Sequence, residues 1–137
     1  MIDIKAVKSR IFEQAEQAYP NECCGALFGR ILDGVKIISG IFPITNAREP
    51  GEQYHRFVIE PGDVMRAERE AAKKGLDVLG FYHSHPDHPA KPSDYDREHA
   101  LPVWSYPIVS VMSGEAMEIT SWRLADDREK FSEEKII

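Results

Sequence analysis

Apolar positions near the start of the chain recur every three or four residues. They are Ile4, Val7, Ile11, Ala15 and Ala18. This spacing predicts an amphipathic helix that packs one face on a core. Asp3 is suited to cap the first turn of this helix, and Pro20 is suited to stop it. We therefore expect the first helix to lie between these two residues.

Two runs of apolar and β-branched residues follow, CCGALFGRIL over 23–32 and VKIISGIFPI over 35–44. The dipeptide Asp33-Gly34 between them favours a tight turn, so the pattern predicts an antiparallel hairpin. The next segment, 45–53, is polar and contains Pro and Gly, which is typical of a surface loop. A short strand is expected after it, around HRFVIE over 55–60.

The middle of the chain alternates between helical and strand patterns. Residues 61–75 read PGDVMRAEREAAKKG, with Pro61 at a permitted helix start and Gly75 just past the expected end. The run LDVLGFYHSH over 76–85 indicates a largely buried strand, and SDYDREHAL over 93–101 a short helix.

The last third predicts another hairpin, formed by YPIVSVM, the turn SGEA and MEITSWRL. The charged end, ADDREKFSEEKII, fits either a solvated helix or a covering strand, and the sequence leaves both open. Strands and helices interleave without a strict βαβ rhythm. We therefore expect one α/β domain over residues 1–137, with a mixed, curved sheet flanked by helices.

The composition of the chain says more about its class of binding partner than about its fold. The chain has 137 residues and a net charge of -6, with 42% hydrophobic and 29% charged residues. An acidic chain is unsuited to a phosphate backbone, so we expect a protein, peptide or small molecule as partner, and neither nucleic acid nor membrane. Because its first residues lack the pattern of a leader peptide, we expect a cytoplasmic protein. The adjacent Cys23 and Cys24 are expected to be buried and reduced, and any further role for them is left open.

The densest chemistry lies in FYHSHPDHPAKPSDYD over 81–96, which holds three histidines and three aspartates. In a strand, His83 and His85 face the same way while Ser84 faces the other, and two imidazoles on one face invite a metal. Ser93 and Asp96 are three apart and share a helix face, so both can turn toward the histidines. Ser-x-x-Asp also resembles a capping box, which is the alternative interpretation of this pair.

Two histidines and a carboxylate, with a fourth position for water, match a catalytic zinc site rather than a structural one. Other acidic residues and histidines are expected to be solvated or to cap turns. These are His55, Asp77, Asp87, His88, Asp94 and His99.

The stretch HSHPDHPAKPSDYD resembles the JAMM motif of the MPN+ metallopeptidases, in which His-x-His-Pro precedes Ser-x-x-Asp by six residues. YPNECCGALFG resembles the family's early strand with its glutamate, here Glu22. The resemblance implies the MPN fold, with an architecture related to cytidine deaminases. It also implies one zinc ion per chain, held by His83, His85 and Asp96. In that family pattern Glu22 moves the proton of the attacking water, and Ser93 donates to the oxyanion.

The compact chain looks similar to prokaryotic relatives that cut the amide after the C-terminal Gly-Gly of ubiquitin-like or sulfur-carrier proteins. A peptidase for cell-wall or phage-tail peptides and a non-catalytic MPN interaction module are the alternatives. A nucleobase deaminase is excluded because Pro-Cys-x-x-Cys is absent. Two glycines suit a narrow groove, which we expect the loop from Thr45 to Gln53 to border. The identity of the carrier is left open, as is the choice between a monomer and a homodimer.

Overall fold

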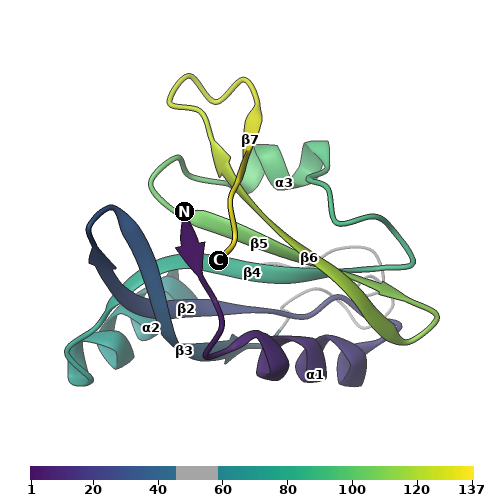
Figure 1. The fold of residues 1–137 in the computed structure, drawn as a ribbon, viewed down its shortest axis with the longest axis horizontal. Helices are drawn as coiled ribbons and strands as arrows, with labels where there is room; N and C mark the ends of the chain where they lie inside the picture. Colours follow the sequence, from purple (N-terminus) through teal and green to yellow (C-terminus); the bar gives the residue numbers. More distant parts are fainter. Residues whose placement is uncertain (46–58) are drawn as a thin grey trace.

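A single curved sheet organises the chain in the computed structural model, which describes residues 1–45 and 59–137 (Figure 1). Within these residues the sheet has seven strands in the order β1-β3-β2-β4-β5-β6-β7. The strands are β1 Ile2–Asp3, β2 Cys24–Leu32, β3 Val35–Ile44, β4 Asp77–Pro86, β5 Ser105–Met112, β6 Glu115–Leu124 and β7 Phe131–Glu134. The β4–β5 and β1–β3 pairs are parallel and the others antiparallel, so the expected mixed sheet is confirmed.

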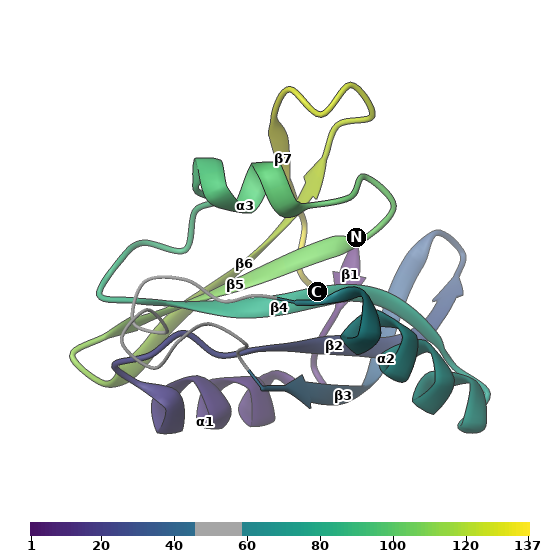
Figure 2. The ribbon, with the colours of Figure 1, turned by 180° about the vertical axis from the view of Figure 1, so that it is seen from behind.

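Helices cover both faces of this sheet (Figure 2). Helix α1, Lys8–Ala18, packs on one face, where Ile11 and Ala15 join a core with Leu27 and Tyr82. Helix α2, Pro61–Lys73, packs on the other face through Ala67 and Ala71. The short helix α3, Asp94–His99, follows β4. None of the helices in the described part of the chain has the length and apolar composition needed to cross a bilayer.

The prediction that Asp3 caps the first helix is wrong. The helix begins at Lys8, and its N-cap residue Val7 makes no side-chain capping bond. Asp3 instead ends β1, and its carboxylate accepts a hydrogen bond from the Lys5 N–H at 3.0 Å. The cause is long-range pairing, because Ile2 and Asp3 form a parallel ladder with β3 that holds these residues extended.

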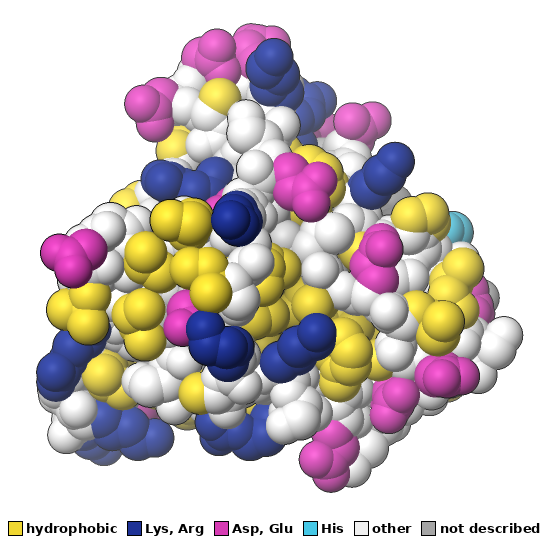
Figure 3. Space-filling view, in the orientation of Figure 1, with side chains coloured by type: hydrophobic (Ala, Val, Ile, Leu, Met, Phe, Trp, Pro, Cys, Tyr) yellow, Lys and Arg dark blue, Asp and Glu magenta, His cyan; other side chains and the backbone are white. Residues whose placement is uncertain are grey.

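Both predicted hairpins are confirmed. Asp33 and Gly34 have φ of 50° and 78° between β2 and β3, and Ser113 and Gly114 have 51° and 86° between β5 and β6. Two successive positive φ angles are what a type I′ turn requires, and that turn matches the twist of the strands. Ile31 beside the first turn is 57% exposed. Hydrophobic side chains are accordingly visible on the surface near this hairpin, at the left of Figure 3.

The charged C-terminal stretch is a strand rather than a helix. Within it, Phe131–Glu134 form β7, which pairs antiparallel with β6 from Ser121↔Glu134 to Leu124↔Phe131. Beyond β7, Ile136 bridges to Ile2 and the Ile2 N–H donates to the Lys135 carbonyl at 3.0 Å. The two edges of the sheet therefore meet, and the chain termini lie close together (Figure 1).

The remaining predictions concern segments around α2. This helix begins at Pro61 as expected, and Glu60 and Asp63 form a reciprocal capping box at its start. The loop predicted over 45–53 and the strand predicted over 55–60 fall almost entirely outside the described residues. Ile59 and Glu60 are described and lie in neither a helix nor a strand.

Candidate metal centre

The end of β4 brings two imidazoles onto one face of the sheet. His83 and His85 alternate with Ser84 along the strand, and their Nε2 atoms lie 3.1 Å apart. His83 is buried, while the His85 side chain is 12% exposed. Ser84 points to the opposite face, where its Oγ accepts a hydrogen bond from the Cys23 N–H. The arrangement that alternation predicted for these residues is confirmed.

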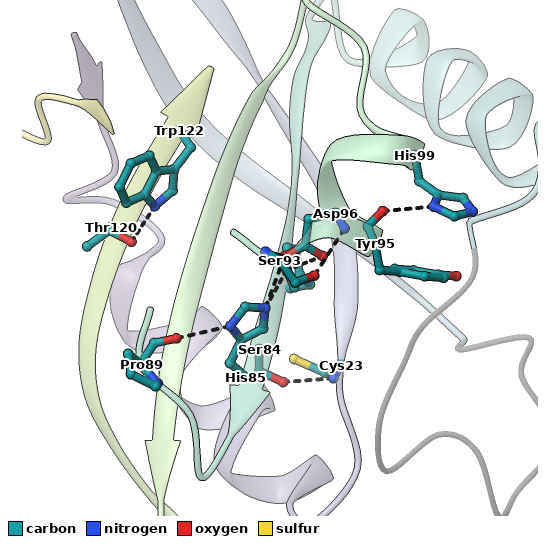
Figure 4. Close-up of polar contacts among 11 residues, drawn as sticks. Cys23, Ser84, His85, Pro89, Ser93, Tyr95, Asp96, His99, Thr120 and Trp122 are labelled. Atoms are coloured by element: carbon teal, nitrogen blue, oxygen red, sulfur yellow. Dashed lines mark hydrogen bonds and ion pairs between the residues drawn. The ribbon is translucent and has the colours of Figure 1, made fainter. Parts of the chain in front are cut away.

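Asp96 reaches both histidines from the first turn of α3. Its Oδ1 lies 3.3 Å from His83 Nε2, and its Oδ2 lies 3.2 Å from His85 Nε2. The same carboxylate accepts the Ser93 N–H at 2.8 Å, and the Ser93 hydroxyl accepts the Asp96 N–H at 3.1 Å. Ser93 and Asp96 thus form the capping box that the sequence offered as an alternative, while Asp96 also faces the histidines (Figure 4).

These three side chains fit a tetrahedral zinc ion. Zinc bonds to His nitrogen and carboxylate oxygen are about 2.0–2.2 Å, so neighbouring ligand atoms stand roughly 3.3–3.5 Å apart. The two Nε2 atoms are 3.1 Å apart, and each lies at a similar distance from one oxygen of Asp96, 3.3 Å from Oδ1 for His83 and 3.2 Å from Oδ2 for His85. The donor set, two imidazoles and a carboxylate, is also one that zinc favours in catalytic sites.

A backbone carbonyl orients the second histidine. His85 Nδ1 lies 3.0 Å from the Pro89 carbonyl oxygen, a contact that requires the proton on Nδ1 and leaves the Nε2 lone pair for a metal. The loop that carries Pro89 is tied to β6, because the Thr120 hydroxyl donates to the Ala90 carbonyl at 2.5 Å. Figure 4 shows Trp122 donating in turn to Thr120.

Burial and hydrogen bonding set the charge of these groups. Burial lowers the pKa of His83 below its usual value, which keeps the ring neutral as a metal ligand requires. Burial alone would raise the pKa of Asp96. The histidines and the Ser93 N–H outweigh that effect, so the pKa of Asp96 lies well below the usual range. The site therefore presents an ionised Asp96 carboxylate beside the neutral ring of His83.

Glu22 lies beside the histidines, as the family resemblance implied. It precedes β2 by two residues, and the ladder pairs Cys24 with His83, so continuing the register places Glu22 opposite His85. Its side chain is buried, and ligand atoms of Glu22, His83 and His85 all lie within 4.8 Å of one another. At that distance a carboxylate can serve either as a proton acceptor for water or as a further metal ligand.

The residues expected to stay out of the site have other contacts or positions. Asp87 accepts hydrogen bonds from the Tyr19 hydroxyl at 2.6 Å and the Ser113 N–H at 2.8 Å. The His99 ring stacks on Tyr95, and its Nδ1 bonds the Tyr95 carbonyl at 2.8 Å. Three further side chains, Asp77, His88 and Asp94, are exposed. His55 lies outside the described residues.

Neither cysteine is placed for metal binding. Cys24 is fully buried under α2, and its Sγ contacts the Ile44 carbonyl at 3.5 Å. Cys23 faces the opposite core beside α1. Burial raises the pKa of the Cys23 thiol to about 11, so it stays protonated at neutral pH. Both cysteines are free thiols in the core, as their adjacency predicted.

An apolar cavity of about 450 Å³ opens next to His83 and Asp96. Its walls come from α2, α3, β4, β5 and β7, and six of its residues are Phe81, Tyr95, Leu101, Trp104, Tyr106 and Phe131. This cavity was not predicted from the sequence. Trp104 and Tyr106 lie on either side of Ser105, the first residue of β5, and their spacing of two was the signal available in the sequence.

The chain is similar to one known family and to several known proteins. A family model described as prokaryotic homologs of the JAB domain matches residues 5–125. Two archaeal proteins named desampylase are similar to this chain. The one from Pyrococcus furiosus is 32% identical, and the match covers 85% of this chain and 75% of the relative. The one from Haloferax volcanii is 33% identical, and the match covers 77% of this chain and 73% of the relative. Tail tip assembly protein K of Escherichia phage N15 is 32% identical over 64% of this chain but only 31% of its own length.

Solved structures share the fold. A protein from Desulfitobacterium hafniense is 31% identical, with a TM-score of 0.85 over 100% of this chain and 92% of its own. A JAB1/MPN domain protein from Archaeoglobus fulgidus is 21% identical, with a TM-score of 0.57 over 99% and 97% of the two chains. The latter likeness concerns the fold alone and places the curved sheet and its helices among JAB1/MPN domains.

Proposed function

We propose, since this chain belongs to the family of prokaryotic homologs of the JAB domain, that it is a zinc-dependent metallo(iso)peptidase of the JAMM type. Its substrate would be the amide bond that follows the C-terminal Gly-Gly of a ubiquitin-like or sulfur-carrier protein. One observation supports this most: His83, His85 and Asp96 converge at the spacing of zinc ligands, with Glu22 beside them. The two buried thiols suit a protein that works in the reducing cytoplasm.

The metal ligands, Glu22 and Ser93 have separate roles in the proposed reaction. When bound by His83, His85 and Asp96, zinc supplies a Lewis acid that polarises the scissile carbonyl and lowers the pKa of water to about 7. Glu22 takes a proton from the attacking water and delivers it to the departing amine. An accepting hydroxyl keeps its own O–H, so Ser93 can cap α3 and still donate to the oxyanion.

The surroundings of the centre favour an extended protein tail as substrate. Two glycines let the backbone approach the metal closely, because no Cβ holds it away. The apolar cavity next to His83 then suits the larger side chains that precede the glycines. The names of the two archaeal relatives point to a related substrate class. A phage-tail peptide stays a second candidate, supported by the N15 relative, although the match covers only 31% of that protein.

Cleavage of a defined substrate tests the proposal. The purified protein with one equivalent of zinc is incubated with a sulfur carrier that bears a short peptide after its Gly-Gly end. The masses of the products are then measured by mass spectrometry. We expect loss of the peptide and a carrier that ends in Gly-Gly. A set of such carriers left intact while a tail-tip peptide is cut would favour the second candidate. No cleavage of either would favour an interaction module.

The two roles of Ser93, capping α3 and donating to the oxyanion, can be separated by substitution. Ser93→Gly removes the hydroxyl, but glycine at an N-cap costs only a few tenths of a kcal/mol of stability. We expect kcat to fall by about 10²–10³-fold, the effect of losing one oxyanion donor. Ser93→Thr keeps the hydroxyl and should keep most of the activity. Equal kcat for Ser93→Gly and wild type would restrict Ser93 to capping.

Leu101 tests the apolar cavity. It lines the cavity yet is 46% exposed, so a charge there disturbs substrate more than folding. We expect Leu101→Asp to raise KM about tenfold with little change in kcat, as when uniform binding is removed. Val103→Asp is the matched control, because Val103 is 65% exposed on the same loop and does not line the cavity. An equal rise in KM for both variants would contradict a role for the cavity.

A further inference from the structure

The serine between the two histidines makes an unusual pair of contacts on the opposite face of β4. Ser84 is fully buried. Its N–H donates to the Cys23 carbonyl at 3.1 Å, and its Oγ accepts from the Cys23 N–H at 2.8 Å. Figure 4 shows the second of these contacts directly below the metal centre. In a hydrogen-bonded pair of an antiparallel ladder the two residues exchange two backbone bonds, whereas here a side chain provides one of the acceptors.

The position of this contact matters because β2 begins only at Cys24. Glu22 and Cys23 precede the strand, so the ladder bonds of β2 do not hold their peptide group. The Cys23 N–H belongs to the amide that joins Glu22 to Cys23. By accepting that N–H, the Ser84 hydroxyl ties the backbone of Glu22 to the strand that carries both histidines.

The peptide that joins Cys24 to Gly25 is held from the same side. Gln14 of α1 contacts the Cys24 carbonyl through Nε2 at 3.4 Å, and its Oε1 accepts a hydrogen bond from the Tyr82 hydroxyl. Cys23 packs its thiol into the core on this face. The segment that presents Glu22 to the metal side of the sheet is therefore fixed from behind, and Ser84 makes the contact nearest to Glu22.

We propose that Ser84 is a positioning residue for Glu22: its hydroxyl holds the Glu22–Cys23 peptide so that the Glu22 carboxylate meets the attacking water in the productive orientation. The inference rests on the proposed function, in which Glu22 moves that proton. It adds a role for the middle residue of His-Ser-His, which points away from the metal and touches no substrate.

Substitution of the hydroxyl tests this role in the zinc-loaded enzyme with a sulfur carrier extended beyond Gly-Gly as substrate. Ser84→Ala should lower kcat by about 10–100-fold, the cost of a misplaced catalytic group. KM and bound zinc should stay at wild-type values, since the change affects the transition state rather than binding. Ser84→Thr, which keeps the hydroxyl and suits a strand, should restore kcat to near the wild-type value.

A matched control separates positioning from simple loss of a buried hydroxyl. Ser121 of β6 is also fully buried in the sheet, away from Glu22, and its hydroxyl donates to Glu134 Oε1 of β7 at 3.0 Å. Ser121→Ala should leave kcat unchanged. A double variant gives the sharpest readout: once Glu22→Gln has removed the proton acceptor, adding Ser84→Ala should lower kcat no further, because two residues that act as a unit are not additive.

Different results would overturn the role of Ser84 and the proposed peptidase function. An inactive wild-type protein overturns the proposed function. Full activity of Glu22→Gln overturns the role of Glu22, and the role of Ser84 with it. If Glu22→Gln is inactive while Ser84→Ala is as fast as wild type, only the role of Ser84 is overturned. That role is also overturned if Ser84→Ala loses zinc or if Ser121→Ala loses equal activity. Should Ser84→Ala fail to fold, Ser84→Cys keeps the volume with a weak acceptor, and its kcat decides in the same way.

Discussion

Replacing Glu22 by Gln is expected to lower kcat by about 10²–10⁴-fold, the usual contribution of a general acid–base group, while zinc stays bound. The amide has nearly the shape of the carboxylate but cannot accept a proton from water. The substitution also decides between the two chemical roles that the distances permit, because Glu22, His83 and His85 offer ligand atoms within 4.8 Å of one another. Steady-state kinetics and metal analysis of the same sample measure both quantities.

Glu13→Gln is the control for this prediction, since it makes the same change on the exposed face of α1. It should match wild type in rate and in metal content. Loss of zinc from Glu22→Gln together with loss of rate would make Glu22 a ligand, and the proton would then need another acceptor. An unchanged rate would remove Glu22 from the reaction.

Removing one metal ligand is expected to empty the site. Wild-type protein purified without added zinc should contain about one equivalent, since three protein ligands and water bind it tightly. His85→Ala and Asp96→Ala should each fall close to zero and lose activity. Their side chains are 12% and 7% exposed and point at one another, so each loss leaves two ligands without the third.

Nearby residues of the same types provide the controls for the ligand variants. His88→Ala and Asp94→Ala change exposed side chains of the same sixteen-residue stretch and should keep the full equivalent of zinc. Inductively coupled plasma mass spectrometry gives the content of all five proteins. Full zinc in both His85→Ala and Asp96→Ala would show that the ligands had been assigned to the wrong residues.

Local sequence was sufficient where local forces decide the structure. Asp33-Gly34 forms the predicted turn because both residues tolerate positive φ, and α2 starts at Pro61 because proline lacks only an N–H that a first turn leaves unbonded. The facing of His83 and His85 follows from strand alternation alone. These features need no information from distant parts of the chain.

Long-range pairing decided what the sequence could not. Asp3 has the chemistry of an N-cap, but the ladder between β1 and β3 takes it into a strand. The charged tail has no clear period, and it is a strand because β6 offers an open edge to Phe131–Glu134. The apolar cavity combines Ile59, Trp104 and Phe131, which are too far apart in sequence for any window to join.

Most of the candidate site could be predicted from the sequence, for a different reason. His83, His85, Ser93 and Asp96 lie within one short stretch, so strand and helix periodicity bring their faces together with little help from the rest of the fold. Glu22 is distant in sequence, and only the resemblance to a family placed it there. The role inferred for Ser84 depends on the pairing of Cys23 with β4, which becomes visible only in three dimensions.

Anomalous diffraction at the zinc edge from crystals of the wild-type protein tests the central claim most directly. We expect one strong peak per chain, about 2.0–2.2 Å from His83 Nε2, His85 Nε2 and an oxygen of Asp96. A peak bound to other residues, or none in protein that contains a full equivalent of zinc, would contradict it.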